Sequence, residues 1–193
     1  MRLILLFLLL PLLTEGQTKP KVLVPIRVFE VHDGDGCKAV LPTGEVIKIR
    51  FSGVDAPEFK SEAMWAEQPH AKQSRDTLRK WITNKTVLLD STTMYGWKQR
   101  DQYGRMLGEL YTLDTVSISV KLARAGCVWP YKSKNFRNKS RMHEILESAK
   151  TAKSKKRGLW RPLKNPAGDL VEPVDPAVWR RMFRVIKMSG WQR

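Results

Sequence analysis

The sequence predicts an α+β domain in which a small barrel of five short β-strands packs against helices on one side. Short runs rich in β-branched residues recur between turn signals, and helical periodicity appears between and after them. The chain has 193 residues, of which 42% are apolar, enough for one domain with extensions. Its formal net charge of +16 indicates a polyanionic partner, either nucleic acid or an anionic surface. Two cysteines are too few for a disulfide-built mini-protein.

The first 16 residues are typical of a secretory signal peptide. Met1-Arg2 precedes an apolar run from Leu3 to Leu13, and small residues follow it. Pro11 interrupts this run, which is too short to cross a bilayer core of roughly 30 Å as a helix. We therefore expect export to the periplasm or the medium, with an uncleaved membrane anchor as the alternative. Export would allow a disulfide between the two cysteines, a question that the sequence leaves open.

Five segments have the composition of strands. The first is rich in Val and Ile and ends at the turn Asp33–Gly36, and a Pro-Thr-Gly turn joins the next two in a hairpin. Apolar residues alternate with Lys48 and Arg50 in the third segment, so we expect Arg50 to point away from the apolar side. The predicted strands are residues 22–31, 37–41, 45–51, 85–91 and 106–112.

Three helices are predicted to pack on this barrel. The first opens at Pro69, which suits a first helical turn, and ends near Ile82. The second covers residues 116–125 and stops at Gly126. The third begins near residue 138 or 140 and ends at residue 158. Its expected apolar face consists of Met142, Ile145, Leu146 and Ala149.

The composition changes after residue 160. Residues 161–176 hold four of the eleven prolines, which predicts an extended strap. A final helix follows, with apolar residues on one face and basic residues on the other. One interpretation docks this helix on the barrel, and the other makes it a basic amphipathic helix for a membrane or a nucleic acid. The basic residues are Arg180, Arg181, Arg184 and Lys187.

Four clusters carry the groups needed to break a phosphodiester bond. Each has an ordinary explanation when taken alone, such as a hairpin turn, a surface ion pair or a turn before a strand. Their order, spacing and residue types are distinctive only together. The clusters are Asp33-Gly34-Asp35, the segment from Arg50 to Glu58, the turn from Asp101 to Arg105, and the stretch from Trp129 to Arg137.

These motifs resemble those of the staphylococcal nuclease (thermonuclease) family over residues 24–160. The resemblance implies an OB-fold barrel, a nuclease domain over residues 17–160, and a C-terminal extension over 161–193. It also implies a Ca²⁺ site formed by Asp35, Asp55 and the backbone carbonyl of Ala56. All-oxygen ligands suit this hard cation. Gly36, Ala56 and Gln102 depart from the family pattern without removing a side chain assigned to the metal or to catalysis.

The same resemblance assigns the catalytic groups. Glu58 corresponds to the group that orients or deprotonates the attacking water. Arg50 and Arg105 correspond to the arginines that grip the scissile phosphate, for which the planar guanidinium is well suited.

Three aromatic residues are candidates for substrate contact. Tyr103 matches a family tyrosine near the nucleotide. Trp129 and Tyr131 are candidates for base stacking, and the alternative is that they fill the end of the barrel.

The function implied is an exported, calcium-dependent nuclease that cleaves DNA and RNA with little sequence preference and leaves 3′-phosphates. A non-catalytic OB-fold module that binds nucleic acid is the alternative, and a protein of membrane surfaces is a third class. Residues 132–157 contain ten Lys and Arg but only Glu144 and Glu147, so this segment either captures substrate or is a solvated helix face.

Overall fold

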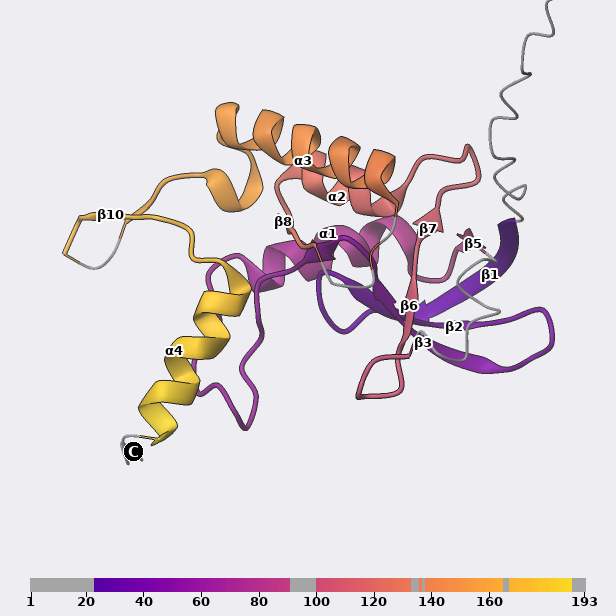
Figure 1. Ribbon diagram of the computed structural model, residues 1–193, viewed down its shortest axis with the longest axis horizontal. Coiled ribbons are helices and arrows are strands. Elements are labelled where there is room, and N and C mark those ends of the chain that lie inside the picture. The colour runs from indigo at the N-terminus through magenta and orange to yellow at the C-terminus, as the bar shows by residue number, and fades with distance from the viewer. Residues whose placement is uncertain (1–22, 91–99, 133–135, 137, 165–166, 189–193) are drawn as a thin grey trace, which may run out of the picture.

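A curled six-stranded sheet forms the centre of the computed structural model, which describes residues 23–90, 100–132, 136, 138–164 and 167–188 (Figure 1). The strand order is β6-β3-β2-β1-β5-β7. Strands β3 and β6 run parallel, and the other neighbouring strands run antiparallel. These strands are β1 (Leu23–Glu30), β2 (Gly36–Val40), β3 (Val46–Phe51), β5 (Thr86–Asp90), β6 (Met106–Gly108) and β7 (Leu110–Tyr111).

The two edges of this sheet are consecutive pieces of one segment. β6 pairs with β3 and β7 pairs with β5, and only Glu109 separates β6 from β7. The sheet therefore curls until its edges meet in residues 106–111, although no ladder within the described residues joins one edge to the other. The α+β prediction is confirmed, and each of the five predicted strand segments contains strand. The fifth divides into two strands, which makes six.

The alternation predicted for β3 is also confirmed. Ile47, Ile49 and Phe51 are buried, whereas Lys48 is exposed and Arg50 is half-buried. Successive residues of a strand point to opposite faces, so the apolar face of β3 enters the core and Arg50 is left at the other face. This orientation is what makes Arg50 available to a site outside the core.

Helices α1 (Ala71–Ile82), α2 (Ile118–Ala125) and α3 (Lys139–Ser154) lie together on one side of the sheet (Figure 1). α1 begins two residues later than predicted, because His70 adopts a left-handed conformation with φ of 69°. α2 ends at Gly126 as predicted. Gly126 has φ of 71°, and a Cβ there would come 2.3 Å from the Arg157 carbonyl oxygen.

The predicted inner face of α3 was wrong at one position. Leu146 is 47% exposed. The buried face of α3 includes the polar residue Ser148, so it is rotated away from Leu146. Its members are Met142, Ile145, Ser148, Ala149 and Ala152.

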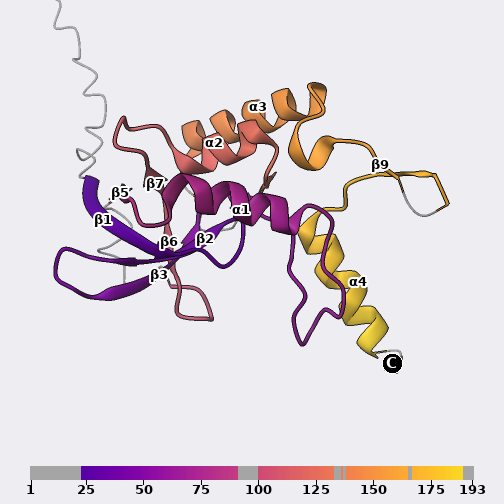
Figure 2. The same cartoon turned by 180° about the vertical axis from the view of Figure 1, so that it is seen from behind.

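The C-terminal extension forms a short hairpin and a final helix. Strands β9 (Leu163–Lys164) and β10 (Leu170–Val171) pair with each other, and α4 (Pro176–Met188) follows. α4 and α3 lie on opposite sides of the molecule, as both views show (Figures 1 and 2). The Asp175 carboxylate accepts a hydrogen bond from the Ala177 N–H at 2.8 Å and so caps the helix. Among the described residues, none of the helices has the length and apolar content needed to span a bilayer. The predicted signal peptide, residues 1–16, lies outside the described residues.

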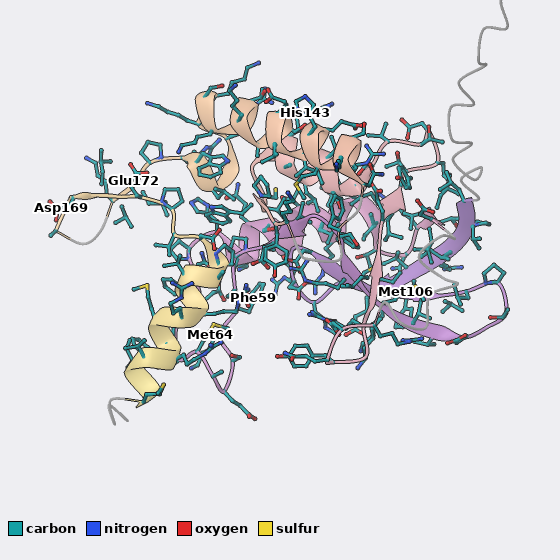
Figure 3. All side chains as sticks on the ribbon, in the orientation of Figure 1. Phe59, Met64, Met106, His143, Asp169 and Glu172 are labelled. Carbon is teal, nitrogen blue, oxygen red and sulfur yellow. The ribbon has the colours of Figure 1, made fainter. Side chains whose placement is uncertain are left out.

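The apolar side chains of α4 pack on the loop that precedes α1. Phe183 is 5% exposed, and its ring meets the Trp65 ring edge-on with 4.9 Å between centroids. Trp179 also packs on Phe183, with 5.3 Å between the ring centroids. Phe59 and Met64 belong to the same loop and line one cleft together with Arg180 and Arg184 of α4 (Figure 3). The final helix is therefore docked, but its apolar contact is this loop and not the barrel that the interpretation named.

Both cysteines are free and buried. Burial raises the pKa of Cys127 to about 11 and that of Cys37 higher still. The disulfide that the sequence left open is therefore absent, and neither thiol is activated for chemistry.

Candidate active site

The turn between β1 and β2 positions the first carboxylate of the site. Asp33 closes this turn by accepting a hydrogen bond from the Asp35 backbone N–H at 3.2 Å. Gly34 lies against α1, where an added Cβ would come 2.0 Å from Ser74 Oγ. Ser74 itself is held by donating to the Cys127 carbonyl at 2.7 Å. Glycine lets the turn pack this closely on the helix, and this packing fixes the position of Asp35.

Asp35 and Asp55 converge on the guanidinium of Arg50. Arg50 Nη2 lies 3.1 Å from Asp35 Oδ2 and 2.7 Å from Asp55 Oδ1. The two carboxylate side chains are only 7% and 6% exposed. The Ala56 N–H donates to Asp35 Oδ2 at 2.5 Å and ties the two segments together. The fold thus buries two carboxyl groups around one guanidinium.

Arg50 is held by the backbone as well as by the carboxylates. Its Nη1 donates to the carbonyls of Phe51 at 3.0 Å and Val54 at 2.8 Å. Val54 belongs to β4 (Val54–Asp55), which pairs with β8 (Trp129–Pro130). Only 13% of the Arg50 side chain is exposed. The guanidinium is therefore fixed before any substrate arrives, as electrostatic stabilisation of a transition state requires.

The surroundings of Asp35 and Glu58 raise the pKa of each carboxyl group. Burial raises the pKa of Asp35 to about 8; the Arg50 charge opposes this rise, and the charges of Asp33 and Asp55 add to it. Burial also raises the pKa of Glu58, against the hydrogen bond and charge of Arg180. A cation placed among these groups would favour their ionised forms.

The donor set fits a hard divalent cation that takes few ligands from the protein. Asp35 and Asp55 offer carboxylate oxygens, the ligands that Ca²⁺ and Mg²⁺ prefer, and both reach one nitrogen of Arg50. Among the described residues, no group of three or more His, Cys, Asp or Glu side chains is arranged to hold a metal ion. A metal here would complete its coordination with water, phosphate and backbone carbonyls, of which the predicted one belongs to Ala56.

Glu58 is anchored through its main chain by a buried glutamine. Gln68, 1% exposed, accepts a hydrogen bond from the Glu58 N–H at 3.0 Å, and the Gln68 N–H donates to the Glu58 carbonyl at 2.8 Å. Gln68 Nε2 also donates to the Val174 carbonyl at 2.6 Å. One glutamine therefore links the segment that carries Glu58 to the strap that leads into α4.

Arg105 is positioned by the turn that precedes β6. Asp101 Oδ2 lies 2.7 Å from Arg105 Nε, and Asp101 Oδ1 accepts the backbone N–H groups of Tyr103 and Arg105, each at 2.9 Å. Gly104 has φ of 73°, the left-handed conformation that such a turn requires. Tyr103 is 70% exposed, and the Arg105 guanidinium lies 5.4 Å from its ring centroid. Arg105 and Tyr103 thus form one unit at the surface.

A cleft of about 990 Å³ joins these groups. Trp129 does not line it: this residue is 8% exposed and packs on Trp160 at 5.6 Å. Tyr131 is 43% exposed and does line the cleft. The other predicted site residues in the cleft lining are Asp35, Arg50, Asp55, Ala56, Glu58, Tyr103 and Arg105.

Two residues of α4, Arg180 and Arg184, line the cleft although the sequence predicts no active-site role for them. Arg180 makes ion pairs with Asp55, at 2.8 Å from Oδ2, and with Glu58. Arg184, one helical turn further on, also lines the cleft. The only signal in the sequence was their i, i+4 spacing on the polar face of the helix. That spacing places both on one side, but it does not indicate that this side faces the carboxylates.

Comparison with known proteins agrees with this geometry. A family model described as "Staphylococcal nuclease homologue" matches residues 48–162, which is more than half of the chain. The chain belongs to the staphylococcal nuclease family. Membership of this family, together with the names of its relatives, makes the chain a nuclease, a hydrolase that acts on nucleic acid. The matched range contains Arg50, Asp55, Glu58 and Arg105, whereas Asp35 precedes it and α4 follows it.

Relatives carry names of the same kind. An "Uncharacterized endonuclease" of Escherichia coli O157:H7 is 32% identical over 154 residues, which cover 80% of this chain and 83% of the relative. Another of that name from Haemophilus influenzae is 27% identical over 168 residues, covering 86% of this chain and 78% of the relative. The "Probable staphylococcal-like nuclease CAN3" of Oryza sativa subsp. japonica is 30% identical over 145 residues, covering 75% of this chain and 31% of the relative.

Proposed function

We propose that this nuclease is exported, depends on calcium, and cleaves DNA and RNA with little sequence preference, leaving 3′-phosphates. The observation that carries the proposal is the convergence of Asp35, Asp55 and Arg50, with Glu58 and Arg105 in the same cleft. The arginines and carboxylates of this centre are suited to binding a phosphate group and a metal ion, and not to recognising a base. The cleft lining offers tyrosine rings and charged side chains, and stacking on such rings tolerates any base.

Different side chains of the cleft carry out proton transfer and charge stabilisation in the proposed reaction. Glu58 accepts a proton from the attacking water, whose oxygen forms a bond to phosphorus in line with the leaving group. The bond from phosphorus to the 5′-oxygen breaks, and the released oxygen takes a proton from solvent. Arg50 and Arg105 stabilise the negative charge that develops on the phosphoryl oxygens. A calcium ion held by Asp35, Asp55 and the Ala56 carbonyl would supply Lewis-acid stabilisation of that charge.

Export is supported by the amino-terminal sequence alone. Residues 1–16 have the charged start, apolar run and small residues of a cleaved signal. Expression of the full-length gene with a carboxyl-terminal tag would test this. We expect the product to be recovered outside the cytoplasm and to begin near Gln17 when its amino terminus is sequenced. An intact Met1 in a cytoplasmic product would contradict export.

The experiment for the activity compares metals, substrates and product ends. Purified protein is incubated with plasmid DNA, single-stranded DNA and RNA in Ca²⁺, in Mg²⁺ and in chelator. We expect cleavage of all three substrates in Ca²⁺, no cleavage in chelator, and ends that become substrates for 5′-labelling without phosphatase treatment. Full activity in chelator would refute the calcium dependence. Binding without cleavage under every metal would favour the non-catalytic OB-fold module.

A further inference from the structure

We propose that α4 contributes a third substrate-binding arginine to the active site, Arg180, and that Arg184 extends the same phosphate-binding surface. The inference rests on the proposed function, since it assigns further substrate contacts to that site. In the free enzyme the Asp55 and Glu58 carboxylates hold the Arg180 guanidinium. When nucleic acid enters the cleft, the phosphate backbone replaces these carboxylates as its partner.

The geometry of Arg180 is that of an active-site group. Its Nη2 lies 2.8 Å from Asp55 Oδ2, while Nη1 pairs with Glu58. The guanidinium therefore bridges the predicted metal ligand and the predicted base. A planar fork of N–H donors that fits two carboxylate oxygens fits two phosphate oxygens equally well.

The position of α4 is fixed by its own packing. Phe183 is buried against Trp65, and Gln68 binds the strap just before the helix at the Val174 carbonyl. Arg180 is thus presented to the cleft by a docked element rather than by a loose tail. Arg184 follows after one turn, about 6 Å along the helix axis, and lines the same cleft.

Exposure distinguishes Arg180 from Arg50. The Arg50 side chain is 13% exposed and is held by two carbonyls besides its carboxylates, so it is fixed in place. The Arg180 side chain is 37% exposed and stands at the edge of the cleft. It can therefore exchange a carboxylate for a phosphate by a change of side-chain rotamer. A cation bound at Asp55 would favour this exchange, because like charges repel.

The first test measures calcium binding in the absence of nucleic acid. Isothermal titration calorimetry is applied to the wild type, Arg180→Ala and Arg181→Ala. Arg181 is a matched control, since it is exposed on the same helix and does not line the cleft. We expect Arg180→Ala to bind Ca²⁺ several-fold more tightly than the wild type, because Asp55 no longer shares its charge with the guanidinium. Equal affinities in Arg180→Ala and Arg181→Ala would overturn the contact.

The second test measures binding of a fluorescent single-stranded oligonucleotide by anisotropy at saturating calcium. Every variant carries Glu58→Gln to prevent cleavage, and binding is measured over a range of salt concentrations. We expect Arg180→Ala with Arg184→Ala to weaken binding and to lower the slope of log K against log salt by about 1.4, since each phosphate contact on a single strand contributes about 0.7. Arg181→Ala should leave this slope unchanged.

The outcomes separate this proposal from the proposed function. If the double variant binds the oligonucleotide as tightly as the Glu58→Gln parent, or more tightly, the proposal is overturned. Either result would mean that α4 blocks the cleft. Cleavage by the wild-type protein is measured in parallel. If the wild type does not cleave, the proposed calcium-dependent reaction is wrong. The salt slope of binding still shows whether α4 binds phosphate.

Discussion

Two arginines on different helices make the same kind of contact in opposite settings. Arg141 of α3 pairs with Glu109 and, at 2.5 Å, with Glu144, and its Nη2 lies 3.2 Å from the Tyr111 hydroxyl. Arg180 of α4 pairs with Asp55 and Glu58. The Arg141 side chain is 16% exposed and the Arg180 side chain 37%. The first is enclosed by protein, and the second stands at a cleft.

This difference teaches that an arginine between two carboxylates has a role set by what surrounds it. Arg141 joins α3 to the segment on which β6 and β7 meet, so it supports the curled sheet. Arg180 joins a terminal helix to groups that also line the cleft, so it can pass from carboxylate to phosphate. We expect stability to depend on the first contact and substrate binding on the second.

The largest effect on stability is expected from Arg141→Met. The substitution keeps an apolar stem but removes the charge beside Glu109, whose side chain is 8% exposed. Breaking a buried pair in this way costs about 3–5 kcal/mol. Urea unfolding should show this loss, while kcat/KM under native conditions should stay within a factor of two. Arg180→Met is the matched control, and it should lose less than about 1 kcal/mol, because Asp55 keeps its ion pair with Arg50 and the Arg180 side chain is itself 37% exposed. Equal losses of unfolding free energy in the two variants would remove the distinction.

Arg50→Ala tests the fixed arginine of the site. Arg50 lies between both buried carboxylates, so its loss removes a preorganised donor for the transition state. We expect turnover to fall roughly 10²–10³-fold, the effect typical of removing one such donor. Steady-state kinetics on single-stranded DNA would measure it, with a thermal melt of the same samples to verify the fold. Arg50→Lys keeps the charge without the planar fork, so its turnover should lie between those of the wild type and Arg50→Ala. A folded Arg50→Ala enzyme with more than a tenth of wild-type turnover would exclude this role.

Asp101→Ala should have a smaller effect through the position of Arg105. The substitution removes an ion pair at 2.7 Å and the acceptor of two backbone N–H groups. A charge-assisted hydrogen bond contributes about 1.5 kcal/mol, so we expect roughly a tenfold loss in kcat/KM. Asp101→Asn is the control, because an amide oxygen can still accept the backbone bonds of the turn. If both variants kept wild-type kinetics, Arg105 would not need this anchor.

Much of this fold could be predicted because its signals are local. The alternation in β3 placed Arg50 outside the core, and glycine ended α2 where it was expected. The division of the fifth strand could not be predicted, since it depends on β6 and β7 pairing with different edges of the sheet. The exposure of Leu146 follows from the exact rotation of α3 against α2, which apolar spacing alone does not fix.

The site shows the same limit at longer range. Resemblance to the motifs of the family identified Asp35, Arg50, Asp55, Glu58 and Arg105, and the structure brings all five to one cleft. Trp129 has the residue type of a stacking platform but packs on Trp160 instead. Arg180 lies 122 residues from Glu58 in sequence. Its contact depends on how the strap directs α4, and no local pattern in the sequence specifies that path.

The smallest effect is expected from the basic residues of α3. Lys150 is 79% exposed, and its nearest carboxylate is Glu147 at 4.0 Å. Lys155 is also exposed, and α3 lies on the side of the molecule opposite α4 (Figures 1 and 2). The Debye length is about 8 Å at physiological ionic strength, so charges on this far side are screened from the cleft. Lys150→Gln with Lys155→Gln should therefore change kcat/KM by less than a factor of two and leave the salt slope of DNA binding unaltered. If the α3 variant reduced the salt slope of DNA binding as much as Arg180→Ala with Arg184→Ala does, α3 would also capture substrate. A position at the cleft would then not be what lets a helix bind nucleic acid.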